Sequence, residues 1–174
     1  MSFNRLTRGD RVILVAGSVL VVVSVFHWLG ARITRIAGKT QGLGDRYAFT
    51  HSAWGYTVTL IAVLLGIAML VYEVMKLLGV EVPDRFGPVS VGQVMLGLGA
   101  ISLVLVLSKV AVGSRVELAS FGLPNLPSGL SKALGLSVQK TRSLASFVGL
   151  GAAAGLFLGG LLKFREDGSP AHRA

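Results

Sequence analysis

Two histidines and a nearby carboxylate are the residues whose types best fit metal or proton chemistry. His27 ends the first apolar run of the chain, His51 opens the second, and Asp45 lies between them. Two imidazoles and one carboxylate form a known metal-ligand set. Neither histidine has a recognisable metal-ligand spacing, and isolated histidines at the ends of apolar runs are more often polar anchors. These three residues are therefore weak polar or metal candidates, and the anchor interpretation is favoured.

Other reactive groups are scarce. The 174 residues include no cysteine, which excludes disulfides, thiolate metal sites and thiol nucleophiles. The Gly42-Leu43-Gly44 stretch is not a phosphate-binding loop, because no Gly-Lys-Ser or Gly-Lys-Thr follows it. No Ser/His/Asp motif, catalytic pair of carboxylates or nucleotide fingerprint supports an enzyme. We therefore expect a non-enzymatic protein that needs no cofactor.

Charged residues inside long apolar runs are functional candidates by default, because a charge at the centre of a bilayer costs a few kcal/mol. Glu73 precedes Lys76 by three residues, a spacing that predicts an ion pair at a helix end. Lys109 lies near the end of another run, from which its side chain can extend to lipid headgroups. Glu73 and Lys109 belong to opposite membrane faces, so we expect no buried charge relay.

The elements that carry these residues are long apolar helices. Hydrophobic residues make up 52% of the chain and charged residues only 14%, against about 25% charged in soluble domains. A helix needs roughly 20 apolar residues to cross the hydrocarbon core of a bilayer. The sequence predicts an all-α membrane protein, a single domain (1–174) formed by an antiparallel bundle of four transmembrane helices. The predicted spans are about 11–30, 52–78, 89–113 and 140–164.

An even number of spans places both termini on one side of the membrane, but the basic residues do not say which side. Eight Lys and Arg residues fall on the side of the termini and nine on the side of the long loops. The positive-inside rule therefore does not decide the orientation. The net charge of +9 is spread over separate segments that flank the spans, which favours contact with lipid headgroups and argues against nucleic acid as a partner.

Glycines recur at a strict four-residue spacing in the last span, as Gly151, Gly155 and Gly159. This glycine-zipper pattern forms a helix face on which another backbone can approach closely, as is common where lipid removes the hydrophobic driving force between helices. Packing within the chain is the favoured interpretation, and an interface in a homo-oligomer is the alternative.

The two long loops predict surfaces that contact membrane lipids, anionic lipids in particular. Arg32, Arg35 and Lys39 fall on one face if the first helix continues past the membrane, and we expect them to contact anionic headgroups. The segment from Ser128 to Gln139 has an amphipathic pattern typical of an interfacial helix, although its glycines suit an irregular loop equally well.

Several short motifs along the chain resemble small four-helix membrane proteins of actinobacteria, which are largely uncharacterised. The motifs are Arg8-Gly9-Asp10-Arg11, Phe26-His27-Trp28, Ser52-Ala53-Trp54, Phe147-Val148-Gly149-Leu150, Gly159-Gly160 and Arg165-Glu166. His27 stands where those proteins often place a proline. The resemblance implies cytoplasmic termini and long loops outside the cell, and it brings no catalytic residues.

These observations favour a structural or interaction component of the plasma membrane. Such a component would form a homo-oligomer or belong to a larger membrane complex. A small oligomeric channel or carrier is the alternative, which the scarcity of central polar residues disfavours. A membrane enzyme that acts on lipid is the second alternative.

Overall fold

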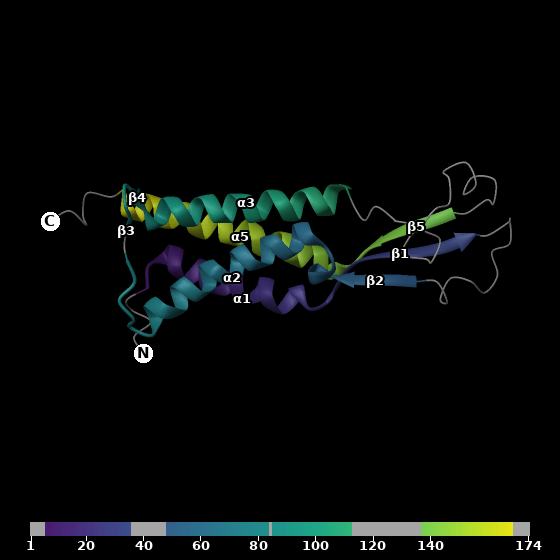
Figure 1. Cartoon of the computed structure of the whole chain (residues 1–174), viewed down its shortest axis with the longest axis horizontal. Helices are drawn as coiled ribbons and strands as arrows, with labels where there is room; N and C mark the ends of the chain where they lie inside the picture. Colours follow the sequence, from purple (N-terminus) through teal and green to yellow (C-terminus); the bar gives the residue numbers. More distant parts are fainter. Residues whose placement is uncertain (1–5, 36–47, 84, 113–136, 169–174) are drawn as a thin grey trace.

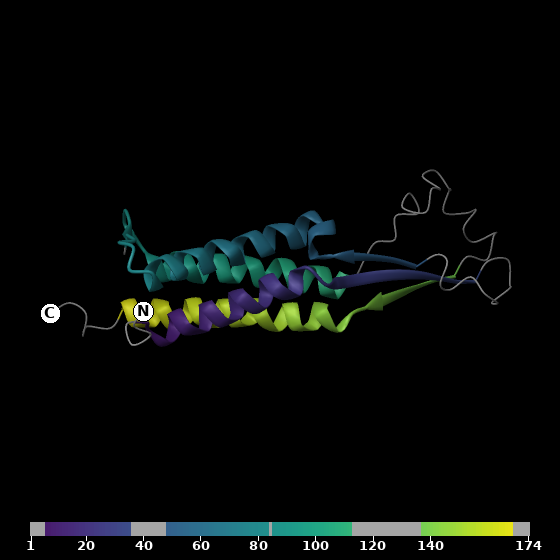
Figure 2. The same cartoon turned by 90° about the horizontal axis from the view of Figure 1, so that it is seen from below.

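The computed structural model describes residues 6–35, 48–83, 85–112 and 137–168, and most of these residues lie in four helices packed side by side (Figures 1 and 2). Two short segments, a 3₁₀ turn (η2) at Ala53–Gly55 and a hairpin of Arg85–Phe86 (β3) and Val89–Ser90 (β4), flank the ends of α2 and α3. The four long helices are α1 (Arg8–Ser24), α2 (Thr57–Leu77), α3 (Val91–Val112) and α5 (Leu144–Asp167).

Three of the four helices, α2, α3 and α5, are long and apolar enough to cross a membrane. In the most apolar 18-residue stretches of α2 and α3, only 33% and 28% of the residues are buried inside the protein, so most of that apolar surface faces outward. Such a surface suits contact with lipid. The shorter α1 has 17 residues and falls below this length, so the fourth span stays a prediction.

The helices form a closed ring around one apolar core. α1 packs against α2 and α5, and α3 packs against the same two helices on the other side. The short connection between α2 and α3, which contains Pro83 and Pro88, predicts antiparallel neighbours. The two helices are in contact and run in opposite directions on either side of the β3–β4 turn (Figure 1), which confirms that interpretation. Ile13, Leu20, Met69 and Leu156 are fully buried at the centre.

The purely α-helical prediction is wrong at the end of the bundle away from the termini, where three strands form an antiparallel sheet (Figure 1). The central strand is β1 (His27–Arg35), flanked by β2 (Ala48–Ser52) and β5 (Ser137–Arg142). The helix predicted for 11–30 therefore stops at Ser24, and the helix predicted from 140 starts at Leu144. Beyond hydrocarbon a backbone can pair with other strands, so the helix is no longer obligatory there.

The change from helix to strand in the first loop also removes the basic helical face. Arg32 and Arg35 lie on β1, where Arg32 pairs with Ala48 of β2 and with Gln139 of β5. Lys39 lies outside the described residues. In the segment expected to form an interfacial helix, 137–139 belong to β5, and 128–136 also lie outside the described residues.

The glycines of α5 bring its backbone against two neighbouring helices. A Cβ atom at Gly159 would lie 2.7 Å from Ile13 Cγ1 and 3.1 Å from Ile13 N on α1, and one at Gly155 would lie 2.9 Å from Ala16 Cβ. Gly160 faces α3, where a Cβ would lie 2.8 Å from Leu96 N. At Gly151, by contrast, a Cβ would meet nothing within 4 Å. Gly155 and Gly159 therefore serve packing within the chain, and Gly151 does not.

This difference predicts that the same substitution destabilises the protein at Gly159 and has little effect at Gly151. Gly159→Ala should destabilise the protein by about 1–3 kcal/mol, because the added methyl overpacks against α1 backbone. Gly151→Ala, the matched control, should have little effect because its surroundings are open. Thermal unfolding in detergent would compare the two variants, and equal stabilities would contradict the close approach at Gly159.

Candidate functional site

A cluster of four charged side chains from three helices lies at the end of the bundle that carries the termini. Its members are Asp10 of α1, Glu73 and Lys76 of α2, and Lys163 of α5. Asp10 and Glu73 are fully buried and Lys163 is 5% exposed, while Lys76 reaches the surface. We refer to these four residues as the ion cluster.

Asp10 is positioned by the first turn of α1. Its backbone N–H donates to Thr7 Oγ1 at 3.3 Å, and its carboxylate accepts from the Thr7 backbone N–H at 3.1 Å, which completes a capping box. A carboxylate in this turn also lies at the favourable, positive end of the helix dipole. The same carboxylate receives two ammonium groups, Lys76 Nζ at 2.7 Å from Oδ2 and Lys163 Nζ at 2.8 Å from Oδ1.

Lys163 is the centre of the cluster. Its ammonium contacts Asp10 on one side and donates to Glu73 Oε1 on the other, and it lies 5.0 Å from the centroid of the Tyr72 ring. Gly9 makes this possible, because a Cβ there would lie 2.8 Å from the backbone N of Lys163. The close backbone contact between α1 and α5 thus holds the carboxylate of Asp10 within reach of the lysine.

The electrostatics of the cluster are balanced, with two carboxylates and two ammonium groups. Charges removed from water are tolerated when they are paired and hydrogen-bonded, and removal of one partner leaves an uncompensated buried charge. Glu73 Oε2 is buried and has no hydrogen-bond partner among the described residues, so Lys163 is the main compensation for that carboxylate. This geometry supports a structural role, in which ion pairs hold α1, α2 and α5 together.

The ion cluster corrects an interpretation drawn from the sequence. Glu73 pairs with Lys163 of α5 and not with its neighbour Lys76, which turns instead to Asp10. Glu73 and Lys109 lie at opposite ends of the bundle, as expected, but the sequence did not predict the buried pairing of Glu73 with Lys163. Two signals in the sequence indicate the cluster: the Thr7-x-x-Asp10 capping pattern, and a lysine at 163 directly after the charge-free run of the last helix.

The histidine pair is only partly described. Strand pairing sets His27 opposite Ser52 and His51 opposite Leu29, so β1 and β2 bring the two histidines into neighbouring registers. The third candidate, Asp45, lies outside the described residues. Within the described ranges no group of three His, Cys, Asp or Glu side chains could hold a metal ion.

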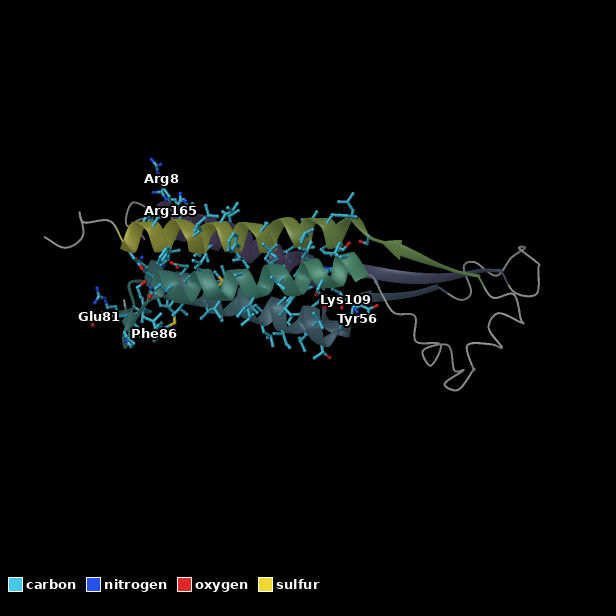
Figure 3. The ribbon with its side chains drawn as sticks, turned by 90° about the horizontal axis from the view of Figure 1, so that it is seen from above. Arg8, Tyr56, Glu81, Phe86, Lys109 and Arg165 are labelled. Atoms are coloured by element: carbon cyan, nitrogen blue, oxygen red, sulfur yellow. The ribbon has the colours of Figure 1, made fainter. Side chains whose placement is uncertain are left out.

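Lys109 lies at the opposite end of the bundle from the ion cluster. Its Nζ is 3.9 Å from the centroid of the Tyr56 ring, a cation–π contact between α3 and the residue that precedes α2 (Figure 3). Different interactions thus link the helices at the two ends of the bundle, ion pairs near the termini and a cation–π contact near the sheet.

Comparison with known proteins gives no relative from which a role could be transferred. No family model matches the chain, and no curated protein is detectably similar to it.

The ion cluster predicts a large effect of removing Lys163. Lys163→Met should destabilise the protein by about 3–5 kcal/mol, because it leaves Glu73 buried without its partner. Lys109→Met is the control and should cost much less. The double variant Glu73→Gln/Lys163→Met should regain part of the loss, because it removes a positive and a negative charge together.

Thermal unfolding in one neutral detergent would give the stabilities of the parent, Glu73→Gln, Lys163→Met and the double variant, which together form a double-mutant cycle. A double variant whose loss equals the sum of the two single losses would show that Glu73 and Lys163 are not coupled.

Proposed function

We propose that the protein is a non-enzymatic structural or interaction component of the plasma membrane, in which four transmembrane helices hold a small sheet against one face of the bilayer. The observation that carries this proposal is the junction between bundle and sheet. β1 continues from the end of α1, β2 leads into α2, and β5 leads into α5, so the sheet projects beyond the helices (Figure 2).

The junction is fixed by two tryptophans. Trp28 is buried, its indole N–H donates to the Val23 carbonyl at 2.8 Å, and its ring occupies the space beside Gly149, where a Cβ would lie 2.4 Å from the ring. The Trp54 indole N–H donates to Ser24 Oγ at 3.1 Å and so links the segment before α2 to the end of α1. These contacts favour a sheet that is held in a defined position relative to the bundle.

The form of the sheet favours a role in binding another protein. β1 is paired on both sides, whereas β2 and β5 are each paired on one side within the described residues. An edge strand presents backbone N–H and C=O groups that a strand of a partner can extend. A second copy of this chain or another subunit of a membrane complex would supply such a strand.

The alternatives receive less support from the bundle. Its centre is filled by apolar side chains, including Leu20, Val63 and Leu156, and the ion cluster is confined to one end. A channel or carrier would need polar groups along a path through the membrane. An enzyme that acts on lipid would need a catalytic constellation, and the balanced pairing in the ion cluster favours a structural role instead.

The proposed orientation follows the resemblance to actinobacterial four-helix proteins, with cytoplasmic termini and the sheet outside. Arg32, Arg35 and Lys39 then remain candidates for contact with anionic headgroups on the outer side, two of them from a strand instead of a helix.

Topology can be tested with single cysteines, because the chain contains none. Arg8 and Phe86 are exposed at the end of the bundle that carries the termini, and His27 is exposed at the other end. A membrane-impermeant maleimide should label Arg8→Cys and Phe86→Cys from one side of intact vesicles and His27→Cys from the other. Labelling of Arg8→Cys and His27→Cys from the same side would show that α1 does not cross the membrane.

The interaction role predicts position-dependent cross-linking in native membranes. A photoreactive amino acid in place of Phe49 on β2 or Val138 on β5 should give a discrete protein adduct, because both strands lie at edges of the sheet. Val104, 62% exposed on α3, is the control and should not give that adduct. The mass of the adduct would separate a second copy from another subunit.

Absence of an adduct at both strand positions, with ion conduction by the purified protein in liposomes, would favour the channel alternative instead.

A further inference from the structure

An apolar groove runs along the outside of the bundle between α1 and α5. It has a volume of about 630 Å³, within the roughly 300–1,000 Å³ typical of ligand pockets. Among the described residues, the lining comes from these two helices and is apolar except at one end. The lining residues are Arg11, Val12, Val15, Ala16, Val19, Val148, Gly151, Ala152 and Gly155.

Small residues make this groove deep. Ala16 and Gly155 touch at its floor, where a Cβ on Gly155 would lie 2.9 Å from that of Ala16. One turn toward the sheet, Gly151 leaves open space, since a Cβ there would meet nothing within 4 Å. Val15, which is 66% exposed, forms part of the wall. The groove is therefore a gap between helices that the side chains of the described residues do not fill.

One end of the groove is basic. Arg11 lines it, and Arg8 precedes Arg11 by one helical turn on the same face of α1. Arg165 of α5 lies at the same end of the bundle (Figure 3). All three are exposed. An arginine carries five N–H donors, so Arg11 can bind a phosphate in addition to a protein partner.

The dimensions match half of a bilayer. From Arg11 to Val19 the helix advances eight residues, or about 12 Å at about 1.5 Å per residue. One leaflet of a hydrocarbon core of about 30 Å is about 15 Å deep. A lipid whose phosphate lies at Arg11 would thus place an acyl chain along the whole groove.

We propose that this groove binds an anionic phospholipid from the leaflet on the side of the termini. One acyl chain lies between α1 and α5 over Gly151, and the phosphate contacts Arg11 and Arg8. Positive charge at the mouth and an apolar channel below it are complementary to such a lipid and not to a second apolar helix. The site is independent of whatever the sheet binds on the other face.

The test measures lipid binding to the purified full chain in neutral detergent, from the rise in melting temperature during titration with phosphatidylglycerol or phosphatidylcholine. Gly151→Phe should fill the groove and weaken phosphatidylglycerol binding about fivefold or more. Gly97→Phe is its matched control, because Gly97 is an exposed helical glycine of α3 whose Cβ would also meet nothing within 4 Å. If Gly151→Phe does not fold, Gly151→Leu tests the same point with a smaller side chain in the groove.

The headgroup part of the proposal has its own pair of variants. Arg11→Gln should weaken phosphatidylglycerol binding about fivefold, since about 1 kcal/mol per basic residue near an anionic surface corresponds to that factor. It should weaken phosphatidylcholine binding less, because the choline group offsets the charge of the phosphate. Arg85→Gln, an exposed arginine in β3, should change neither.

Equal phosphatidylglycerol binding by the parent and both Gly151 variants would overturn the proposal. So would a parent dimer that Gly151→Phe converts to monomers without a change in lipid binding, because the groove would then belong to a second copy.

Discussion

The close approach of the α5 backbone to α1 and α3 is the constraint on which the other features depend. Gly159 and Gly9 remove the side chains that would separate α5 from α1, and Gly160, Gly99 and Gly92 do the same between α5 and α3. Dispersion forces and paired polar groups must hold helices together where lipid supplies no hydrophobic driving force, and both act only at short range. The backbone contacts therefore set the positions from which the charged and aromatic side chains act.

The close packing of the α5 backbone allows different contacts at the two ends of this helix. Near the termini, Lys163 reaches both Asp10 and Glu73, and Asp167 accepts a hydrogen bond of 2.8 Å from the backbone N–H of Gly92 at the start of α3. Near the sheet, Gly149 leaves room for the ring of Trp28, whose carbonyl accepts from the Ser143 backbone N–H at 3.0 Å. The helix with the close backbone contacts to α1 and α3 thus also fixes the junction with β1.

The apolar runs predicted the helices, because length and hydropathy are local properties, and α2, α3 and α5 were found where they were expected. The sheet could not be predicted in the same way, since β1 pairs with β5 across more than 100 residues and its register depends on that distant partner. The partner of Glu73 was missed for a related reason. Spacing along α2 indicates Lys76, whereas the fold brings Lys163 to Glu73 from 90 positions away.

The order of the charged residues along the chain adds a constraint on assembly. Asp10, Glu73 and Lys76 belong to the first two helices, which together carry two carboxylates and one ammonium group in the cluster. Until α5 docks, Glu73 lacks the only ammonium that contacts it among the described residues. A carboxylate without a partner disfavours close packing of α1 and α2 in a low-dielectric environment, and Lys163 removes that cost. The last helix therefore supplies both the glycine face for close packing and the positive charge that pairs with the carboxylates of the first two helices.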